Sequence, residues 1–134
     1  MTPVVKNEFS ELSCSRTGKV IFQFWTKASA QLSEWEFLEQ IDTLFSTAEV
    51  FNSDVLCIDA FDFCYPFNKK AIQIISKHLK SSAIKNIGIV MSSKLLGKLH
   101  ILLLIKSIPP SNNTLSIFNS RKEAEEWLLS IHSR

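Results

Sequence analysis

The sequence predicts a single-domain α/β fold with a mostly parallel sheet and an N-terminal hairpin. Segments typical of strands alternate with amphipathic segments typical of helices, in the order β-β-α-β-α-β-α-β-α, which favours parallel strands joined by helical crossovers. The 134 residues suit one domain, and we expect it to span residues 1–134 with a core at about 8–132. A hydrophobic content of 46%, including ten Phe and three Trp, excludes a disordered chain.

A hairpin and a capped helix open the predicted order. Residues 8–15 and 19–25 flank a short turn, and the second run, VIFQFW, is rich in the β-branched and aromatic residues of strands. Ser33 and Glu36 then form a capping box, because each side chain can bind a free N–H at a helix start. The apolar residues behind the box recur at spacings of three and four: Leu38, Ile41, Phe45 and Ala48.

The rest of the chain alternates strand and helix signals. Short apolar runs of the kind found in buried parallel strands occur at 55–58, 87–91 and 115–118. We expect helices over 66–79 and 94–106 and after the second capping box at 120–123. Pro66 suits a first helical turn, Ser92 and Ser93 can cap the next helix, and Pro109-Pro110 is expected to stop it.

The carboxyl ends of the predicted strands are a candidate catalytic site, because ligands of such sheets bind there. Asp59, with Ser92 after the next strand, is similar to the phospho-accepting site of a receiver domain. That site also needs an early acidic pair to hold Mg²⁺, where this chain offers Thr26 and Lys27. Asp59 as a strand-end turn residue is therefore the favoured interpretation.

No other constellation of nucleophile, base or metal ligands is expected. Cys64 precedes a predicted helix start that could activate its thiol, but His78 lies several turns further along the chain. The three His lack zinc-binding spacing, and no glycine-rich phosphate motif is present. We therefore expect no enzyme, no cofactor and no metal.

Targeting signals and cysteine usage favour a cytoplasmic protein. The N-terminal stretch has no apolar signal segment, and the most apolar run, residues 95–105, is far shorter than the ~20 residues of a membrane span. Cys14, Cys57 and Cys64 form neither a disulfide framework nor a CxxC pair.

The net charge of +2 hides an uneven distribution along the chain. Residues 1–68 hold four basic and ten acidic groups, residues 69–106 hold eight Lys and no acid, and residues 107–134 hold three of each. Two interpretations remain open: a solvated helix face paired with the acidic first helix, or a basic surface for an acidic protein partner or anionic lipid headgroups. Nucleic acid is disfavoured, because no aromatic residues are interleaved with these lysines.

The predicted helix at 94–106 is apolar around most of its circumference. Such a helix is expected to be buried on more than one side. Either neighbouring helices cover it entirely, or it forms a homodimer interface, a partner surface or a cleft for an apolar ligand.

Four segments between Lys19 and Trp127 form a recognisable pattern: the strand VLCIDAFDF, the helix that follows it, the block IGIVMSSKLLGKLHILLLIKSIPP and the closing SIFNSRKEAEEWL. In these segments the chain resembles the STAS-like superfamily, with the SpoIIAA-like fold of anti-sigma-factor antagonists, and particularly its small stand-alone bacterial members. It implies a βα superhelix that regulates other proteins by binding them, without a cofactor. Those antagonists are phosphorylated on a Ser or Thr where this chain has Tyr65 to Lys70, which include neither, so the usual phospho-switch is not expected.

The predicted function is therefore a non-enzymatic regulatory protein-interaction module, expected to form a homodimer. The alternative is a carrier or sensor of an apolar or lipid-like ligand, since SEC14-type lipid carriers are relatives of this fold. The partner-binding residues are expected at the start of the helix after the central strand and along the apolar helix: Asn68, Lys69, Lys70, Ser92, Ser93, Lys94, Leu95, Lys98 and Leu102.

Overall fold

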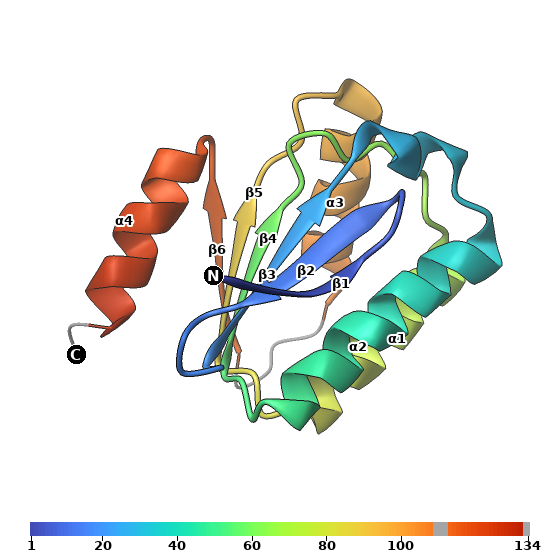
Figure 1. Ribbon diagram of the computed structural model, residues 1–134. Coiled ribbons are helices and arrows are strands. Elements are labelled where there is room, and N and C mark those ends of the chain that lie inside the picture. The colour runs from blue at the N-terminus through green and yellow to red at the C-terminus, as the bar shows by residue number, and fades with distance from the viewer. Residues whose placement is uncertain (109–112, 133–134) are drawn as a thin grey trace.

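The computed structural model describes residues 1–108 and 113–132, which form one six-stranded sheet with helices on both faces (Figure 1). The strands are β1 (Thr2–Lys6), β2 (Ser10–Cys14), β3 (Val20–Trp25), β4 (Val55–Asp59), β5 (Asn86–Val90) and β6 (Thr114–Phe118). The α-helices are α1 (Glu34–Val50), α2 (Lys69–Ser81), α3 (Leu95–Ser107) and α4 (Arg121–His132), and a 3₁₀ helix, η1 (Lys27–Gln31), precedes α1. The predicted α/β class is confirmed.

The strands lie in the sheet in their order along the chain, β1-β2-β3-β4-β5-β6. β1, β2 and β3 are antiparallel, and β3 to β6 are parallel. The predicted order omitted β1, so the N-terminal hairpin is in fact a three-stranded antiparallel unit. β1 is a mostly exposed edge strand containing Pro3, and therefore it lacks the buried apolar pattern by which strands are predicted.

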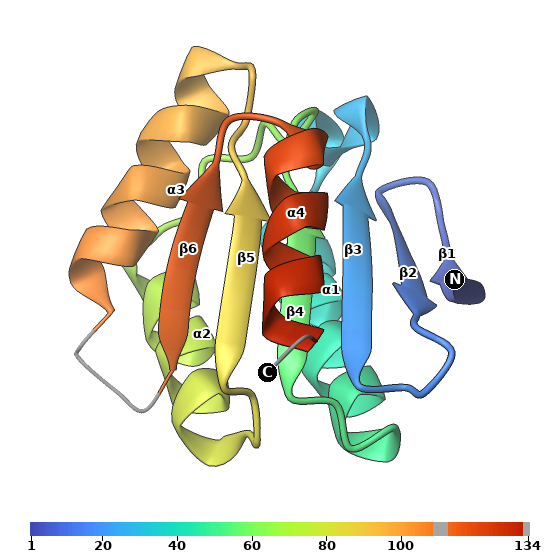
Figure 2. The same cartoon turned by 90° about the vertical axis from the view of Figure 1, so that its left-hand side faces the viewer.

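Three helices cover one face of the sheet and one helix covers the other (Figure 2). Because β3 to β6 are successive neighbours, crossovers of a single hand place α1, α2 and α3 on the same face. α4 follows the last strand and lies alone on the opposite face. The larger core lies beneath α1 to α3, and a smaller core lies beneath α4, where Ala124 and Trp127 pack with Val55 and Cys57.

Hydrogen bonds between nearby residues determine where α1 and α2 begin, and the sequence predicted one of these two starts. The capping box of α1 is confirmed: Ser33 Oγ accepts from Glu36 N at 3.1 Å, and Glu36 Oε1 accepts from Ser33 N at 2.9 Å. The predicted start of α2 at Pro66 is wrong, because Asn68 caps the helix by accepting from Ala71 N at 3.0 Å. Pro66 lies in the preceding loop.

α3 begins one residue later than predicted, at Leu95, after an N-cap position occupied by Lys94. Ser92 Oγ does accept a hydrogen bond from Lys94 N at 3.0 Å, but it lies before the helix start. Pro109 and Pro110, the predicted stop, lie outside the described residues.

Candidate functional site

α3 presents a leucine face to solvent. The opposite side of the helix packs onto the fold through Gly97 and Ile101, which are buried. The side chains of the leucine face have exposed fractions between 41% and 72%: Leu95, Leu96, Leu99, Leu102 and Leu103. Among the described residues no helix covers this face, so the alternative that α3 is wholly buried within the fold is wrong.

A groove of about 680 Å³ runs between α2 and α3, next to the leucine face. Its α2 wall carries Lys69, Lys77 and Lys80, and its α3 wall includes Leu103. Phe67, which is buried, also lines the groove. The fold therefore joins an apolar surface and a row of three lysines into one continuous region, which we call the α2–α3 surface.

Two residues predicted to bind a partner have polar contacts within the fold. Asn68 lines the groove, but its amide oxygen is used as the α2 cap. The Nζ atom of Lys70 lies 3.2 Å from Glu34 Oε1 on α1, so this lysine pairs with the acidic helix. Lys69 lines the groove wall. The pairing of this lysine-rich segment with the acidic first helix is therefore seen at Lys70, and a partner surface at the other lysines stays a prediction.

The two serines before α3 hold loops together. Ser92 is 2% exposed, and its Oγ donates to Phe63 O at 2.7 Å. Ser93 Oγ donates to Phe61 O at 2.9 Å. A partner cannot reach Ser92 in this arrangement, whereas Lys94, Leu95, Lys98 and Leu102 are exposed on or beside α3.

The carboxyl edge of the parallel strands holds an ion pair. Asp59, at the end of β4, is 6% exposed and forms a salt bridge with Arg121 of α4. Its Oδ1 also accepts from Phe61 N at 3.0 Å, which is the turn role expected of it. Asp59 is thus engaged in joining α4 to the sheet.

Cys64 and His78, the candidates for a reactive pair, lie before the start of α2 and in its last turn, respectively. Burial raises the pKa of Cys57 from 9.0 to about 12, with the charges of Asp59 and Glu125 adding to the effect. Cys64 is half-buried in the loop before α2. His78 faces α1, where its Nε2 lies 3.8 Å from Asp42 Oδ1. Within the described ranges, no group of three or more His, Cys, Asp or Glu could hold a metal ion.

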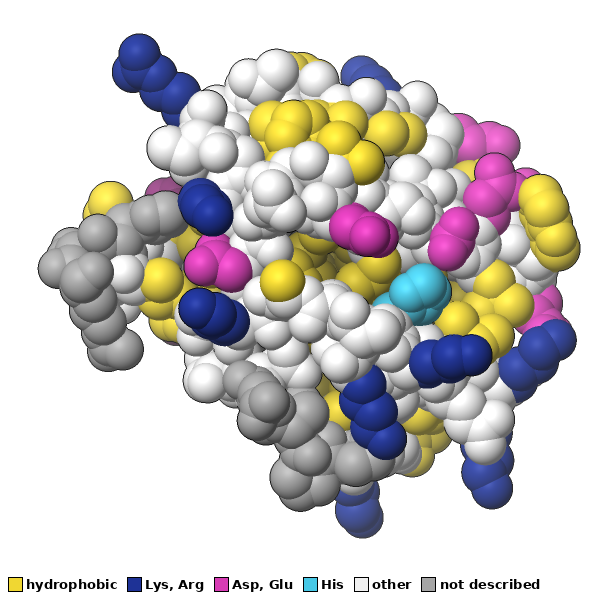
Figure 3. All heavy atoms as spheres, turned by 90° about the horizontal axis from the view of Figure 1, so that it is seen from below, with side chains coloured by type: hydrophobic (Ala, Val, Ile, Leu, Met, Phe, Trp, Pro, Cys, Tyr) yellow, Lys and Arg dark blue, Asp and Glu magenta, His cyan; other side chains and the backbone are white. Residues whose placement is uncertain are grey.

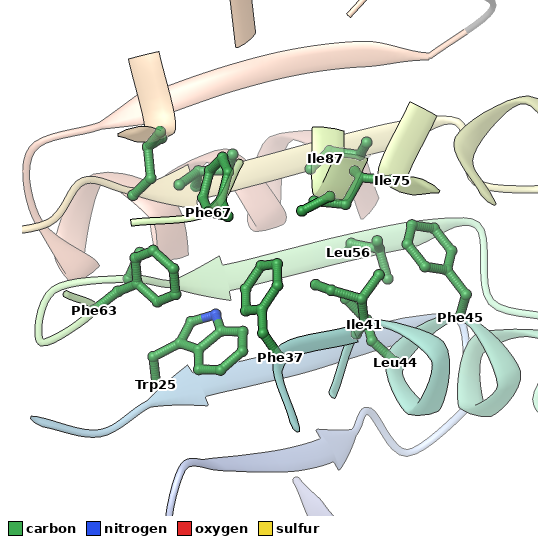
Figure 4. Close-up of a cluster of buried hydrophobic side chains, with 14 of the residues drawn as sticks. Trp25, Phe37, Ile41, Leu44, Phe45, Leu56, Phe63, Phe67, Ile75 and Ile87 are labelled. Atoms are coloured by element: carbon green, nitrogen blue, oxygen red, sulfur yellow. The ribbon is translucent and has the colours of Figure 1, made fainter. Parts of the chain in front are cut away.

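A cavity of about 90 Å³ lies between the sheet and the three helices, lined almost entirely by apolar side chains. Figure 4 shows that labelled residues from β3, β4, β5, α1 and α2 point toward one another across this space. Gln23, at the middle of β3 and 1% exposed, is the amide among its lining residues. The Nε2 atom of Gln23 has no hydrogen-bond partner within residues 1–108 and 113–132. Leaving such a group unpaired costs about 1–3 kcal/mol.

Gln23 faces the cavity because of its position along β3. It shares the helix-facing side of β3 with Ile21 and Trp25, and its cross-strand neighbours are Leu12 and Ile58. None of these neighbours has a side-chain acceptor for an amide. Sequence reasoning missed Gln23, although a lone polar residue within VIFQFW is the signal by which it could have been found.

A hollow of about 400 Å³ opens near the cavity, between the C-terminal halves of α1 and α2. Figure 3 shows this side of the molecule, with apolar side chains on the floor of the hollow and a histidine and acidic side chains around it. Phe45 lines both the hollow and the cavity, and its ring stacks on that of His78 with centroids 4.8 Å apart.

Comparisons of the chain with family models, curated proteins and solved structures find no match. The site is therefore defined by its own geometry. No helix in the described part of the chain is long and apolar enough to cross a membrane.

Proposed function

We propose that the chain is a STAS-like interaction module whose α2–α3 surface binds an acidic amphipathic segment of a partner protein. The observation that carries the proposal is the leucine face of α3, exposed beside a groove walled by Lys69, Lys77 and Lys80. The arrangement of α1, α2 and α3 on one face of β3 to β6 supports the STAS-like assignment.

The apolar part of this surface favours binding of a protein partner, because binding would remove the leucine side chains from water. Contiguous apolar patches of this kind mark interaction sites, and burying one leucine side chain contributes about 1.5–3 kcal/mol. Leu102 and Leu103 are only about half exposed, so a partner can complete their burial. An apolar helix face of the partner supplies the matching surface.

The positive charge of the surface indicates which residues flank the apolar face of the partner. Residues 69–106 contain eight Lys and no acidic residue, so carboxylates flanking the partner's apolar face complement the groove. A second copy fits less well, because joining two α3 faces brings Lys94, Lys98 and Lys106 of both copies into the same interface. The preferred occupant is therefore an acidic segment of another protein.

A matched pair of labelled peptides tests this function by fluorescence anisotropy. Both are amphipathic helices of about 14 residues, which spans the roughly 20 Å length of α3, and both carry the same leucine face. One is flanked by Glu and the other by Lys. We expect saturable binding of the Glu peptide, weakened about fivefold by Lys77→Glu at low salt and more than about tenfold by Leu103→Glu.

Two variants on α4 serve as controls, because α4 lies on the opposite face of the sheet. Lys122→Glu repeats the charge change and Leu129→Glu repeats the loss of an exposed leucine, and neither is expected to alter binding. Equal affinity for the two peptides contradicts the charge argument. The proposed partner would also be wrong if the chain bound no peptide but self-associated in sedimentation velocity and Leu103→Glu abolished that self-association. The occupant of the surface would then be a second copy of the chain.

A further inference from the structure

We infer that the cavity between the sheet and α1 to α3 is a binding site for a small neutral molecule, apolar apart from one hydrogen-bond acceptor that Gln23 recognises. This inference is independent of the proposed function, because the cavity lies beneath the helices and the α2–α3 surface lies outside them.

The amide of Gln23 specifies the acceptor. Its Nε2 carries two N–H donors, is buried, and has no partner in the described part of the chain. Around it the wall is formed by residues such as Ile41, Leu56, Ile87 and Ile101. A carbonyl or ether oxygen on a bound molecule would accept a hydrogen bond from the amide, and the rest of that molecule would contact mainly aliphatic and aromatic side chains.

The size and the wall of the cavity specify the remainder of the ligand. The volume of about 90 Å³ is smaller than the roughly 150 Å³ of an engineered apolar cavity that binds benzene. This limits the enclosed part of a ligand to a few heavy atoms. A charged group is excluded, because no described charged residue lines the cavity and an unpaired charge is strongly disfavoured there.

Phe45 provides a route from solvent. This residue lines both the hollow and the cavity, and its ring stacks on that of His78, which also lines the hollow. Rotation of this one side chain would join the two spaces. Side-chain rotations of this kind need no rearrangement of the sheet or the helices.

Acetone and isobutene test the inference, because they have the same shape and differ in that acetone has an acceptor oxygen. The full chain is labelled with ¹³C at isoleucine methyl groups, and each compound is titrated while the methyl resonances of Ile41, Ile87 and Ile101 are followed. We expect saturable binding of both compounds. In Gln23→Leu the ratio of the acetone affinity to the isobutene affinity should fall by up to about tenfold, the effect of losing one buried hydrogen bond.

The change in this ratio distinguishes recognition from a structural role, since a general change in packing would alter both affinities in the same direction. Gln23→Leu is expected to fold, because it replaces an unpaired amide by a side chain of similar size. The inference fails if neither compound shifts these methyl resonances saturably, or if Gln23→Leu leaves the ratio of the two affinities unchanged. Loss of peptide binding at the α2–α3 surface would leave it intact.

Discussion

Gly97→Ala is the substitution that tests most sharply how α3 is seated. A Cβ atom at position 97 would lie 2.2 Å from Phe63 O and 2.5 Å from Ser92 Oγ. The Phe63 oxygen belongs to the backbone of the loop after β4, so it cannot turn aside as a side chain could. α3 therefore has to move outward by about 1 Å to reach an ordinary contact distance.

Two effects of opposite sign decide the result. Alanine is favoured over glycine inside a helix by about 1 kcal/mol, and less in the first turn, where Gly97 lies. Overpacking of this kind costs about 1–3 kcal/mol, and the shift also disturbs the hydrogen bond from Ser92 Oγ to Phe63 O. We expect the contact to outweigh the propensity and the free energy of unfolding to fall by about 1–2 kcal/mol.

Urea denaturation and thermal melting measure this difference. The expected loss lowers Tm by about 3–8 °C for a domain of this size. Lys98→Ala, at the adjacent exposed position of the same helix, is the control and should change the free energy of unfolding by less than about 0.5 kcal/mol. A Gly97→Ala variant as stable as the natural chain, or more stable, would refute the close seating of α3.

Three further changes test the opposite face of the sheet. Gly88→Ala should destabilise the fold by about 1–3 kcal/mol in urea denaturation, because a Cβ there would lie 2.5 Å from the Trp127 ring; an unchanged midpoint would contradict this packing. Arg121→Ala should lower the free energy of unfolding by about 1–2 kcal/mol, because it leaves the buried Asp59 carboxylate without its ion pair. The loss is smaller than for a fully buried pair, since the Arg121 side chain is 64% exposed. An unchanged stability would show that the ion pair is not formed. The pKa of Cys57 is raised from 9.0 to about 12, so between those pH values the unfolded thiol ionises and the folded one does not. Stability should then fall by about 1.4 kcal/mol per pH unit relative to Cys57→Ala, and parallel pH profiles of the two proteins would argue against a buried thiol.

The parts of the fold that the sequence predicted are those determined by local chemistry. The Ser33–Glu36 box set the start of α1 because both hydrogen bonds lie within one turn. The run at 55–58 predicted β4 because a parallel central strand is covered on both faces. β1 was missed because its stability comes from pairing with β2 along an exposed edge, which leaves no apolar pattern in its own residues.

The candidate site was predicted less completely, because its parts depend on tertiary contacts. The lysine-rich segment was identified from charge alone, but only the structure separates Lys69 on the groove wall from Lys70 paired with Glu34. Ser92 was placed at a helix start by its chemistry, whereas its burial follows from the loop after β4 packing over it. The position of Gln23 in the core could not be predicted, because it depends on which side of β3 faces the helices. That side is determined by how β3 pairs within the whole sheet.

Binding at the α2–α3 surface is tested most directly by mapping the bound Glu peptide onto the ¹⁵N-labelled chain by NMR. We expect backbone amide resonances of Lys69–Ser81 and Leu95–Ser107 to shift during the titration, while those of Arg121–His132 stay in place. Shifts concentrated on α4 or on the β1 edge, or no shifts at all, would contradict the claim that the α2–α3 surface is where this protein binds its partner.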